Sequence, residues 1–467
     1  MLDDAQPAPF TPAHVPGVMQ PMSLPQIVSA ARRNALETIP AIAYRQPMVS
    51  GKTIIRWHMV MDPGALRRIM LDAVDDYPKS ELTQRLLRPA IGTSIFTSEG
   101  DEWRWQRRAA APIFNHRKMV ALSPMMTAAA DRTAERLAKS IDDGFDGTGV
   151  ADVMDEMVTA TFEIVCDALL SGGEGLDRRE IGGAITRYFD TIGKVSILDI
   201  AGVPNWIPRP SQLMNRGVMN GTVEMVDKLI ASRRASLESY EGADDLLGYM
   251  LRAEDPETGQ KMDDATLRNN LLSFIVAGHE TTALALAWSL YLLANDKTAQ
   301  DRAAEESRAA IGQGPAAAEH LERLPYIRQV LDEAMRLYPP AAMLSRTARV
   351  DDELCGREVR KGDLVTLPIY ALHRHELLWE NPLQFNPDNF APEKAKARDR
   401  YTYLPFGAGP RVCIGMNFAL MEAAIILATL LARLEFAPRP GHTPEPVVTM
   451  TLRPKGGMPL KVTRRAQ

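Results

Sequence analysis

The chain has 467 residues, of which 45% are hydrophobic and 24% are charged, and its formal net charge is -5. This composition is that of an ordinary globular protein with a large core, and the weakly acidic balance argues against a general nucleic-acid binder. The three cysteines, Cys166, Cys355 and Cys413, form no CxxC pair, which argues against a disulfide framework or structural zinc site and indicates a reducing, cytoplasmic setting.

The N-terminal part of the chain predicts little regular structure. Residues 1–25 are rich in proline and have no apolar run, so we expect an extended segment that is neither a signal peptide nor a membrane anchor. Residues 53–63 are β-branched and apolar and predict a strand. From Pro63 to Leu337 the spacing of Ala, Leu, Met and Glu predicts helices, with breaks at 144–149 and 204–211.

The most apolar long segment runs from Leu271 to Ala294. A bilayer needs about 20 such residues, so this segment is long enough to cross one. Glu280 lies in its middle, however, and an ionisable side chain at that depth is costly. We therefore expect a long buried helix in a soluble core.

The character of the chain changes after "YPP" (338–340). Residues 357–370 predict short strands, 379–400 a long irregular segment, and 416–436 a strongly apolar helix. No repeat or linker divides the sequence. We predict a single domain over residues 1–467, mainly α with a minor β part (α+β).

The segment "LPFGAGPRVCIG" (404–415) contains Cys413 among three glycines, Gly407, Gly409 and Gly415. Glycine permits positive φ and close backbone approach, and the start of the following helix favours a thiolate. Such a cysteine suits a metal ligand or a nucleophile. A structural cysteine buried in a glycine turn is the alternative.

The pattern Phe406-x-x-Gly409-x-Arg411-x-Cys413-x-Gly415 resembles the haem-binding signature of the cytochrome P450 family. The resemblance implies the P450 fold, with haem b between the long central helix and the helix that follows the cysteine. It implies that Cys413 is the axial iron ligand, a thiolate that favours O–O cleavage, with Phe406 beside the sulfur and Arg411 on a haem propionate. Gly407, Gly409 and Gly415 would let the loop lie against the macrocycle.

Other segments support the same resemblance. "AGHETT" (277–282) is similar to the family's oxygen-activation motif, which implies a helix opened over the haem, with Ala277 nearest the haem and Thr281 and Glu280 managing O2 and protons. Trp103, Arg107 and Arg346 resemble family residues that reach the propionates.

The "EAMR" segment resembles the family's structural ion pair. It places Glu333 and Arg336 at i, i+3 on a helix. The chain departs from the family pattern in "FNPDNF" (385–390), where Asn389 replaces the Arg that completes this network. Cys166 and Cys355 match no functional position, and we interpret them as core packing and a turn neighbour.

The resemblance also suggests a substrate and a partner. Apart from Thr281, the residues expected at the distal pocket are apolar, which indicates a hydrophobic small molecule: Phe96, Ala277, Thr281, Ala341, Met343 and Met450. No reductase domain is recognisable, so electrons would come from a ferredoxin or flavodoxin, with NAD(P)H used only indirectly. The donor would dock on the basic residues Arg104, Arg108, Arg117 and Lys118.

The predicted function is a monooxygenase that inserts one oxygen atom of O2 into its substrate. Two alternatives fit the same residues: an H2O2-driven haem-thiolate peroxygenase, and a non-catalytic haem-binding or sensor protein. The Glu280–Thr281 pair argues against the first alternative.

Overall fold

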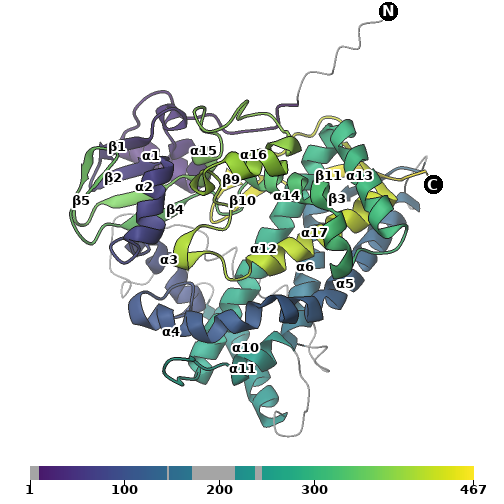
Figure 1. Cartoon of the computed structure of the whole chain (residues 1–467), viewed down its shortest axis with the longest axis horizontal. Coiled ribbons are helices and arrows are strands. Elements are labelled where there is room, and N and C mark those ends of the chain that lie inside the picture. Colours follow the sequence, from purple (N-terminus) through teal and green to yellow (C-terminus); the bar gives the residue numbers. More distant parts are fainter. Residues whose placement is uncertain (1–9, 143, 145–146, 171–215, 237–244, 467) are drawn as a thin grey trace, which may run out of the picture.

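The computed structural model describes residues 10–142, 144, 147–170, 216–236 and 245–466; the break predicted at 204–211 lies outside them. Helices dominate the described chain (Figure 1). They are α1 (Leu24–Arg33), α2 (Pro63–Arg67), α3 (Glu81–Ile91), α4 (Gly100–Ala110), α5 (His116–Asp142), α6 (Val153–Leu170), α10 (Arg216–Ser236), α11 (Leu246–Arg252), α12 (Asp264–Asn295), α13 (Lys297–Ile311), α14 (Pro325–Leu337), α15 (Ile369–Leu372), α16 (Pro392–Ala397) and α17 (Met416–Arg433).

The strands form small sheets at the margins of the helical body (Figure 1). They are β1 (Met48–Lys52), β2 (Arg56–Val60), β3 (Gly149–Asp152), β4 (Leu344–Thr347), β5 (Asp352–Leu354), β6 (Arg357–Val359), β7 (Leu364–Leu367), β8 (Leu434–Pro438), β9 (Glu445–Val448), β10 (Leu452–Lys455) and β11 (Pro459–Arg464). The largest sheet has the order β1-β2-β7-β4, a second has the order β3-β11-β8, and β5–β6 and β9–β10 are two-stranded. This confirms the predicted fold class.

Three predicted boundaries were wrong. The strand expected at 53–63 is shorter, because residues 53–55 form the turn of a hairpin in which β2 (Arg56–Val60) pairs with β1. The helix expected at 416–436 ends at Arg433, because Leu434 begins strand β8, which pairs with β11. Strand β3 interrupts the stretch expected to be helical, since it pairs with β11 near the other end of the chain.

The N-terminal segment begins as predicted, without regular structure from residue 10 until α1 starts at Leu24. Its backbone is fixed by buried tyrosines. The Tyr338 hydroxyl donates to the Ala13 carbonyl at 2.6 Å, and the Val15 N–H donates to the Tyr370 hydroxyl at 3.0 Å.

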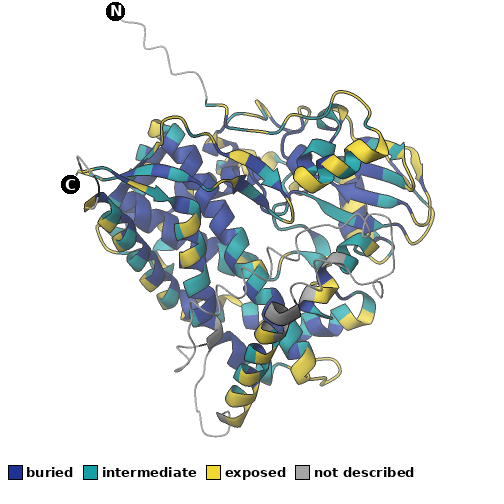
Figure 2. Ribbon diagram, turned by 180° about the vertical axis from the view of Figure 1, so that it is seen from behind, coloured by how far each residue is buried: buried dark blue, intermediate teal, exposed yellow. Residues whose placement is uncertain are grey.

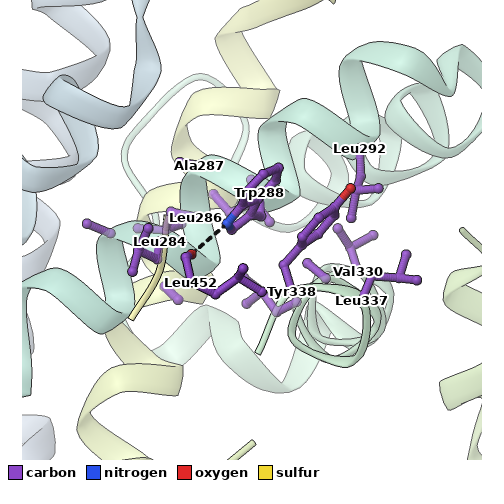
Figure 3. Close-up of a cluster of buried hydrophobic side chains, with 14 of the residues drawn as sticks. Leu284, Leu286, Ala287, Trp288, Leu292, Val330, Leu337, Tyr338 and Leu452 are labelled. Atoms are coloured by element: carbon purple, nitrogen blue, oxygen red, sulfur yellow. Dashed lines mark hydrogen bonds between the residues drawn. The ribbon is translucent and has the colours of Figure 1, made fainter. Parts of the chain in front are cut away.

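Helix α12 is the central element of the core. Every residue from Thr282 to Ala294 is buried, and the dark-blue interior of Figure 2 follows the same helices. By length and composition alone α12 and α17 could cross a membrane, but 72% and 67% of their apolar windows are buried inside the protein. Figure 3 shows Trp288 of α12 stacked on Tyr338, with 3.8 Å between ring centroids, while its indole N–H donates to the Leu452 carbonyl at 3.1 Å.

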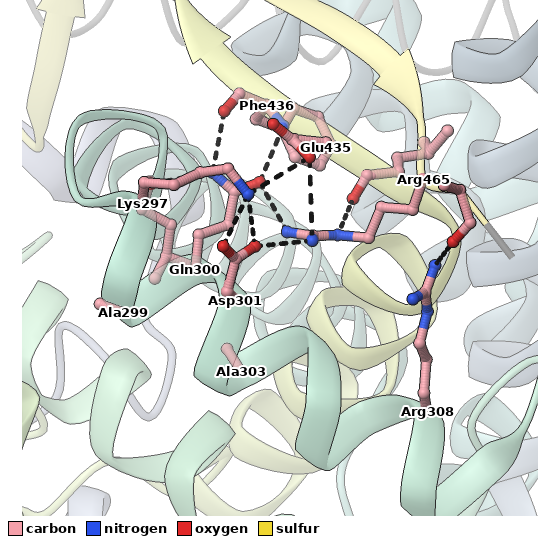
Figure 4. A network of polar contacts seen from close by, with 12 residues as sticks. Lys297, Ala299, Gln300, Asp301, Ala303, Arg308, Glu435, Phe436 and Arg465 are labelled. Atoms are coloured by element: carbon pink, nitrogen blue, oxygen red, sulfur yellow. Dashed lines mark hydrogen bonds and ion pairs between the residues drawn. The ribbon is translucent and has the colours of Figure 1, made fainter.

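The C-terminal strand closes onto the helical body through a polar network (Figure 4). Arg465 follows β11, and its guanidinium contacts Asp301 at 2.8 Å and Gln300 at 3.1 Å on α13. Arg465 also donates to the Leu434 carbonyl, and Arg308 of α13 donates to the Ala466 carbonyl. These bonds hold the C-terminal residues Arg465 and Ala466 against α13 and the start of β8.

Candidate functional site

The loop that carries Cys413 lies directly before α17. The Cys413 N–H donates to the Phe406 carbonyl at 2.9 Å, which closes the loop on itself. Phe406 is half-buried and packs against a small cluster that contains Ala285 of α12, Met335 and Leu420. Cys413 is free and keeps an exposed side. The loop therefore presents a sulfur atom next to the central helix.

The surroundings of Cys413 act on its thiol in opposite directions. The sulfur is open on one side and enclosed by protein on the others, and this enclosure raises the pKa of the Cys413 thiol. The Gly415 N–H and the Arg107 guanidinium lower the same pKa. Arg107, which we expected at a propionate, thus has the Cys413 sulfur as its charge partner, and burial lowers the pKa of its guanidinium.

The three glycines of the loop differ in the structural reason for their presence. Gly407 and Gly409 have φ of 70° and 66°, where only glycine is unstrained. A Cβ on Gly409 would lie 1.9 Å from the Met70 carbonyl oxygen, so packing on the segment Arg68–Asp72 requires glycine at this position. A Cβ on Gly415 would meet nothing within 4 Å.

A cluster of charges lies beside this loop, and we call Lys79, Glu99, Arg346 and Arg411 the charge cluster. Arg411 stacks on the Trp103 ring at 3.9 Å and pairs with the Glu99 carboxylate. Lys79 lies 3.4 Å from the same carboxylate. Arg346 is 9% exposed, and its guanidinium donates to the Ser345 carbonyl. Three cations thus surround one carboxylate, which leaves a net charge of +2.

Lys79 and Glu99 were missed at the sequence level. Both belong to segments that carry no short motif around them, "YPKSEL" and "TSEGDE". They come together because residues 78–80 run beside β4, where Ser80 N–H donates to the Ser345 carbonyl and Thr347 N–H to the Pro78 carbonyl. No local sequence signal reports this long-range pairing.

On α12, the predicted oxygen-activation residues are placed on one turn. The Thr281 hydroxyl donates to the Ala277 carbonyl at 2.7 Å, and Ala277 is exposed. Glu280 accepts from the Thr451 hydroxyl at 2.6 Å and from Arg453. The helix is continuous from Asp264 to Asn295, so the local opening implied by the resemblance is absent from α12.

Close packing against α6 explains the glycine at position 278 in the same turn. A Cβ there would lie 3.2 Å from the Val165 side chain of α6, and the Thr161 hydroxyl donates to the His279 carbonyl at 2.8 Å. Glycine thus lets α6 approach α12 closely.

Comparison with known proteins decides the family. The "Cytochrome P450" family model matches residues 54–462. The chain belongs to the cytochrome P450 family. It is therefore a haem-thiolate monooxygenase, and membership implies haem b and O2.

Individual relatives agree. This P450 is similar to a cyclooctat-9-en-7-ol 5-monooxygenase of Streptomyces melanosporofaciens, with 34% identity over 76% of this chain and 75% of that protein. It is 32% identical to a cytokinin hydroxylase of Arabidopsis thaliana over 82% of this chain and 74% of that protein. Among solved structures, the haem domain of cytochrome P450DA matches with a TM-score of 0.77 and 26% identity, covering 90% of both chains.

The residues present fit a haem. An accessible thiol next to a helix N-terminus suits a thiolate ligand. A cluster of net charge +2 matches the two carboxylates that haem carries, and Arg346 is a buried cation that forms no ion pair of its own with a carboxylate of the described residues.

The structural ion pair of the P450 is fully buried. Arg336 binds Glu333 with two bonds of 2.7 Å, and both side chains have no exposed surface. Asn389, at the position where the family commonly has Arg, donates its amide to Glu333 at 3.2 Å. Arg398 stacks on Trp379 at 4.2 Å and donates to the Asn389 carbonyl. The Glu333 carboxylate stabilises the positive charge of Arg398. Asn389 and Arg398 together take the place of the expected arginine.

The segments predicted to form the substrate pocket contact α12 at separate points, at Asn270 for the segment of Phe96 and at Glu280 for the segment of Met450. Ile95 N–H, next to Phe96, donates to Asn270 of α12 at 2.8 Å. Leu452 N–H, two residues after Met450, donates to the Pro340 carbonyl, beside Ala341. Phe96 and Met450 are exposed by 46% and 38%, whereas Met343 is half-buried.

The basic residues of the predicted docking surface are partly neutralised. Arg104 pairs with Asp75 and Asp101, and Arg108 pairs with Asp255 and Glu257. Lys118 lies 4.2 Å above the Tyr249 ring, and Arg117 is exposed. The positive potential expected from the local sequence is therefore reduced by acids from distant segments.

Proposed function

We propose that this P450 oxidises a hydrophobic small molecule, with Cys413 as the axial ligand of haem b and with electrons from a separate redox protein. The observation that carries the proposal is the accessible Cys413 thiol, whose loop packs through Phe406 on α12 next to the charge cluster. When bound through a thiolate, haem supplies the cleavage of O2 that the reaction needs. The domain would span the whole chain, residues 1–467.

Residues around this sulfur would hold and orient the cofactor. Arg411, Arg346 and Lys79 would bind its carboxylates, and Trp103 supports Arg411 by stacking. Arg107 and the Gly415 N–H would stabilise the Cys413 thiolate, since both lower the pKa of its thiol. Phe406 and Gly407 would shape the loop beside the sulfur.

Thr281 and Glu280 of α12 would hold and transfer the protons that the reaction with O2 needs. The Thr281 hydroxyl is held by the Ala277 carbonyl and is half-exposed. Glu280, the preceding residue in the chain, would relay protons and is held by Thr451 and Arg453. An acid and an alcohol on one turn support proton-dependent use of O2 rather than a passive sensor.

The substrate would contact apolar side chains. Ala277, Ala341, Met343, Phe96 and Met450 all retain exposed or half-exposed surface. Methionine walls adapt to the shape of a ligand, and the small alanines leave space. These features favour a hydrophobic substrate.

The redox partner would dock near α4 and the start of α5. Because Arg104 and Arg108 already have acidic partners, exposed Arg117 offers the stronger attraction for an acidic ferredoxin or flavodoxin. Arg117→Gln should slow reduction by such a donor and reduce its salt dependence. Equal rates for wild type and variant would contradict this docking surface.

The test of the proposed function compares two electron sources. Hydrophobic compounds are first screened for a shift of the haem spin state. Turnover of a compound that binds is then measured with NAD(P)H, a ferredoxin reductase and a ferredoxin, and separately with H2O2. We expect partner-driven turnover to exceed peroxide-driven turnover and Thr281→Ala to lower it. Faster peroxide-driven turnover would favour a peroxygenase, and no turnover with either source would favour a sensor.

A further inference from the structure

Glu99 is the acidic member of the charge cluster, whose other three members are cations. It lies at the N-terminus of α4, where an acidic side chain can stabilise a helix by capping it, but its side chain makes no such cap. Its carboxylate instead turns to Arg411 and Lys79. The Glu99 side chain is 15% exposed, so these contacts are only weakly screened by water.

Three segments far apart in the sequence meet at Glu99. Its carboxylate accepts the Lys79 backbone N–H at 3.1 Å and pairs with the Lys79 ammonium and the Arg411 guanidinium. The neighbouring Ser98 carbonyl accepts from both cations, at 3.2 Å from Lys79 and 2.9 Å from Arg411. Glu99 thus shares its two partners with any carboxylate that the charge cluster receives.

We propose that Glu99 sets the charge of this cluster, and so limits how tightly the cluster holds the carboxylates of haem and how readily the iron is reduced. The inference rests on the proposed function, because it takes the charge cluster as the place where the haem carboxylates bind. Glu99 acts through Arg411 and Lys79 and is a positioning residue rather than a catalytic one.

The physical argument is one of charge. Glu99 competes with a haem carboxylate for the same donors, since Arg411 and Lys79 have a finite number of N–H groups. It also places a negative charge beside the cofactor, which disfavours the more negative, reduced form of the iron site. Removing the charge should therefore strengthen cofactor binding and raise the reduction potential.

The pKa of Lys79 determines the pH at which the measurement is made. Burial, and then the neighbouring Arg411, lower the pKa of the Lys79 ammonium to about 7. At a pH of about 6 Lys79 is mostly charged in the wild type. Glu99 raises this pKa, so Glu99→Gln lowers it further, whereas the haem carboxylates that the cluster would receive favour the charged ammonium. With Lys79 charged, the cluster charge is +2 in the wild type, +3 in Glu99→Gln, +1 in Lys79→Gln and +2 in the double variant.

The experiment measures the rate of haem transfer from each full-length holoprotein to excess apomyoglobin, and the reduction potential of each by spectroelectrochemistry. Release should slow by about threefold or more in Glu99→Gln and accelerate similarly in Lys79→Gln, while the double variant returns to the wild-type rate. The potential should rise in Glu99→Gln and fall in Lys79→Gln.

Asp101→Asn provides the matched control. Asp101 is two residues away on the same helix, its side chain is fully exposed, and it pairs with Arg104 outside the cluster. The same loss of one charge there should leave both measurements unchanged.

Release that is equal to or faster than wild type in Glu99→Gln would overturn the inference. If Glu99→Gln does not fold, unchanged release in Lys79→Gln overturns it equally. Failure of the proposed function is separable, because then the wild type itself would lack the CO spectrum of a thiolate-bound haem. If that spectrum is present and the rates do not follow cluster charge, only the role of Glu99 is wrong.

Discussion

Glu422 of α17 is an acid buried without a hydrogen-bond partner in the described part of the chain. Its side chain is completely buried, and neither carboxylate oxygen is hydrogen-bonded to a described residue. Burial raises the pKa of Glu422 well above its usual range, and the nearby Thr282 hydroxyl offsets only part of this effect. Folding therefore favours the protonated form of Glu422.

This predicts a specific dependence of stability on pH. Since the folded pKa lies above the unfolded one, the contribution of Glu422 is fully present below the unfolded pKa and is lost as the pH rises toward and through the folded pKa. Glu422→Gln removes that dependence. As the pH rises above the unfolded pKa, the free energy of unfolding of the variant should therefore increase relative to wild type, by at most about 1.4 kcal/mol per pH unit, in urea titrations. A difference that stays constant with pH would contradict a raised pKa of Glu422.

Individual residues also show what sequence patterns can supply. Cys413, Thr281 and the Glu333–Arg336 pair lie in short motifs whose spacing carries their meaning, and the structure places the pair as predicted. The closure of this network by Asn389 and Arg398 could not be predicted, because helix α16 lies between them in the chain and stacking on Trp379 brings Arg398 into place.

At the scale of elements, the helical body was predictable because apolar spacing reports burial directly. Helix α12 and the short strands within 357–370, which are β6 and β7, were predicted from such patterns. Strand β3 could not be, because its four residues are a strand only through pairing with β11, roughly three hundred residues later.

The cysteine loop and the segment Arg68–Asp72 form one packed unit, which gives an element-scale prediction. Gly409→Ala would place a methyl group against the Met70 carbonyl at positive φ, and we expect a loss of at least about 2 kcal/mol in unfolding free energy. Gly415→Ala is the control, since its φ is -88° and its Cβ would meet nothing. Equal stability of the two variants in denaturant titrations would show that the packing argument is wrong.

For the whole molecule, the C-terminal network of Figure 4 ties β8 and β11 to α13. Arg465 is 9% exposed in its side chain and binds Asp301, Gln300 and a carbonyl oxygen. Neighbouring Arg464 pairs with Asp142, and both side chains are more than half exposed. The two arginines therefore make a natural comparison of buried and exposed ion pairs.

Arg465→Gln should lower the unfolding free energy by about 1–3 kcal/mol, because it removes the donor that joins Asp301, Gln300 and the Leu434 carbonyl. Arg464→Gln should change it by less than about 1 kcal/mol, since exposed ion pairs are screened by water. Thermal unfolding of both variants measures the difference. If Arg464→Gln were the more damaging change, the network would not anchor the C-terminus.

The central claim, that Cys413 is the thiolate ligand of a haem, is tested most directly by the CO difference spectrum of the reduced protein, with Cys413→Ala measured beside it. We predict a strongly red-shifted Soret band in the wild type that disappears in Cys413→Ala. An ordinary haem–CO band in the wild type, or a red-shifted band that survives in Cys413→Ala, would contradict the assignment of Cys413.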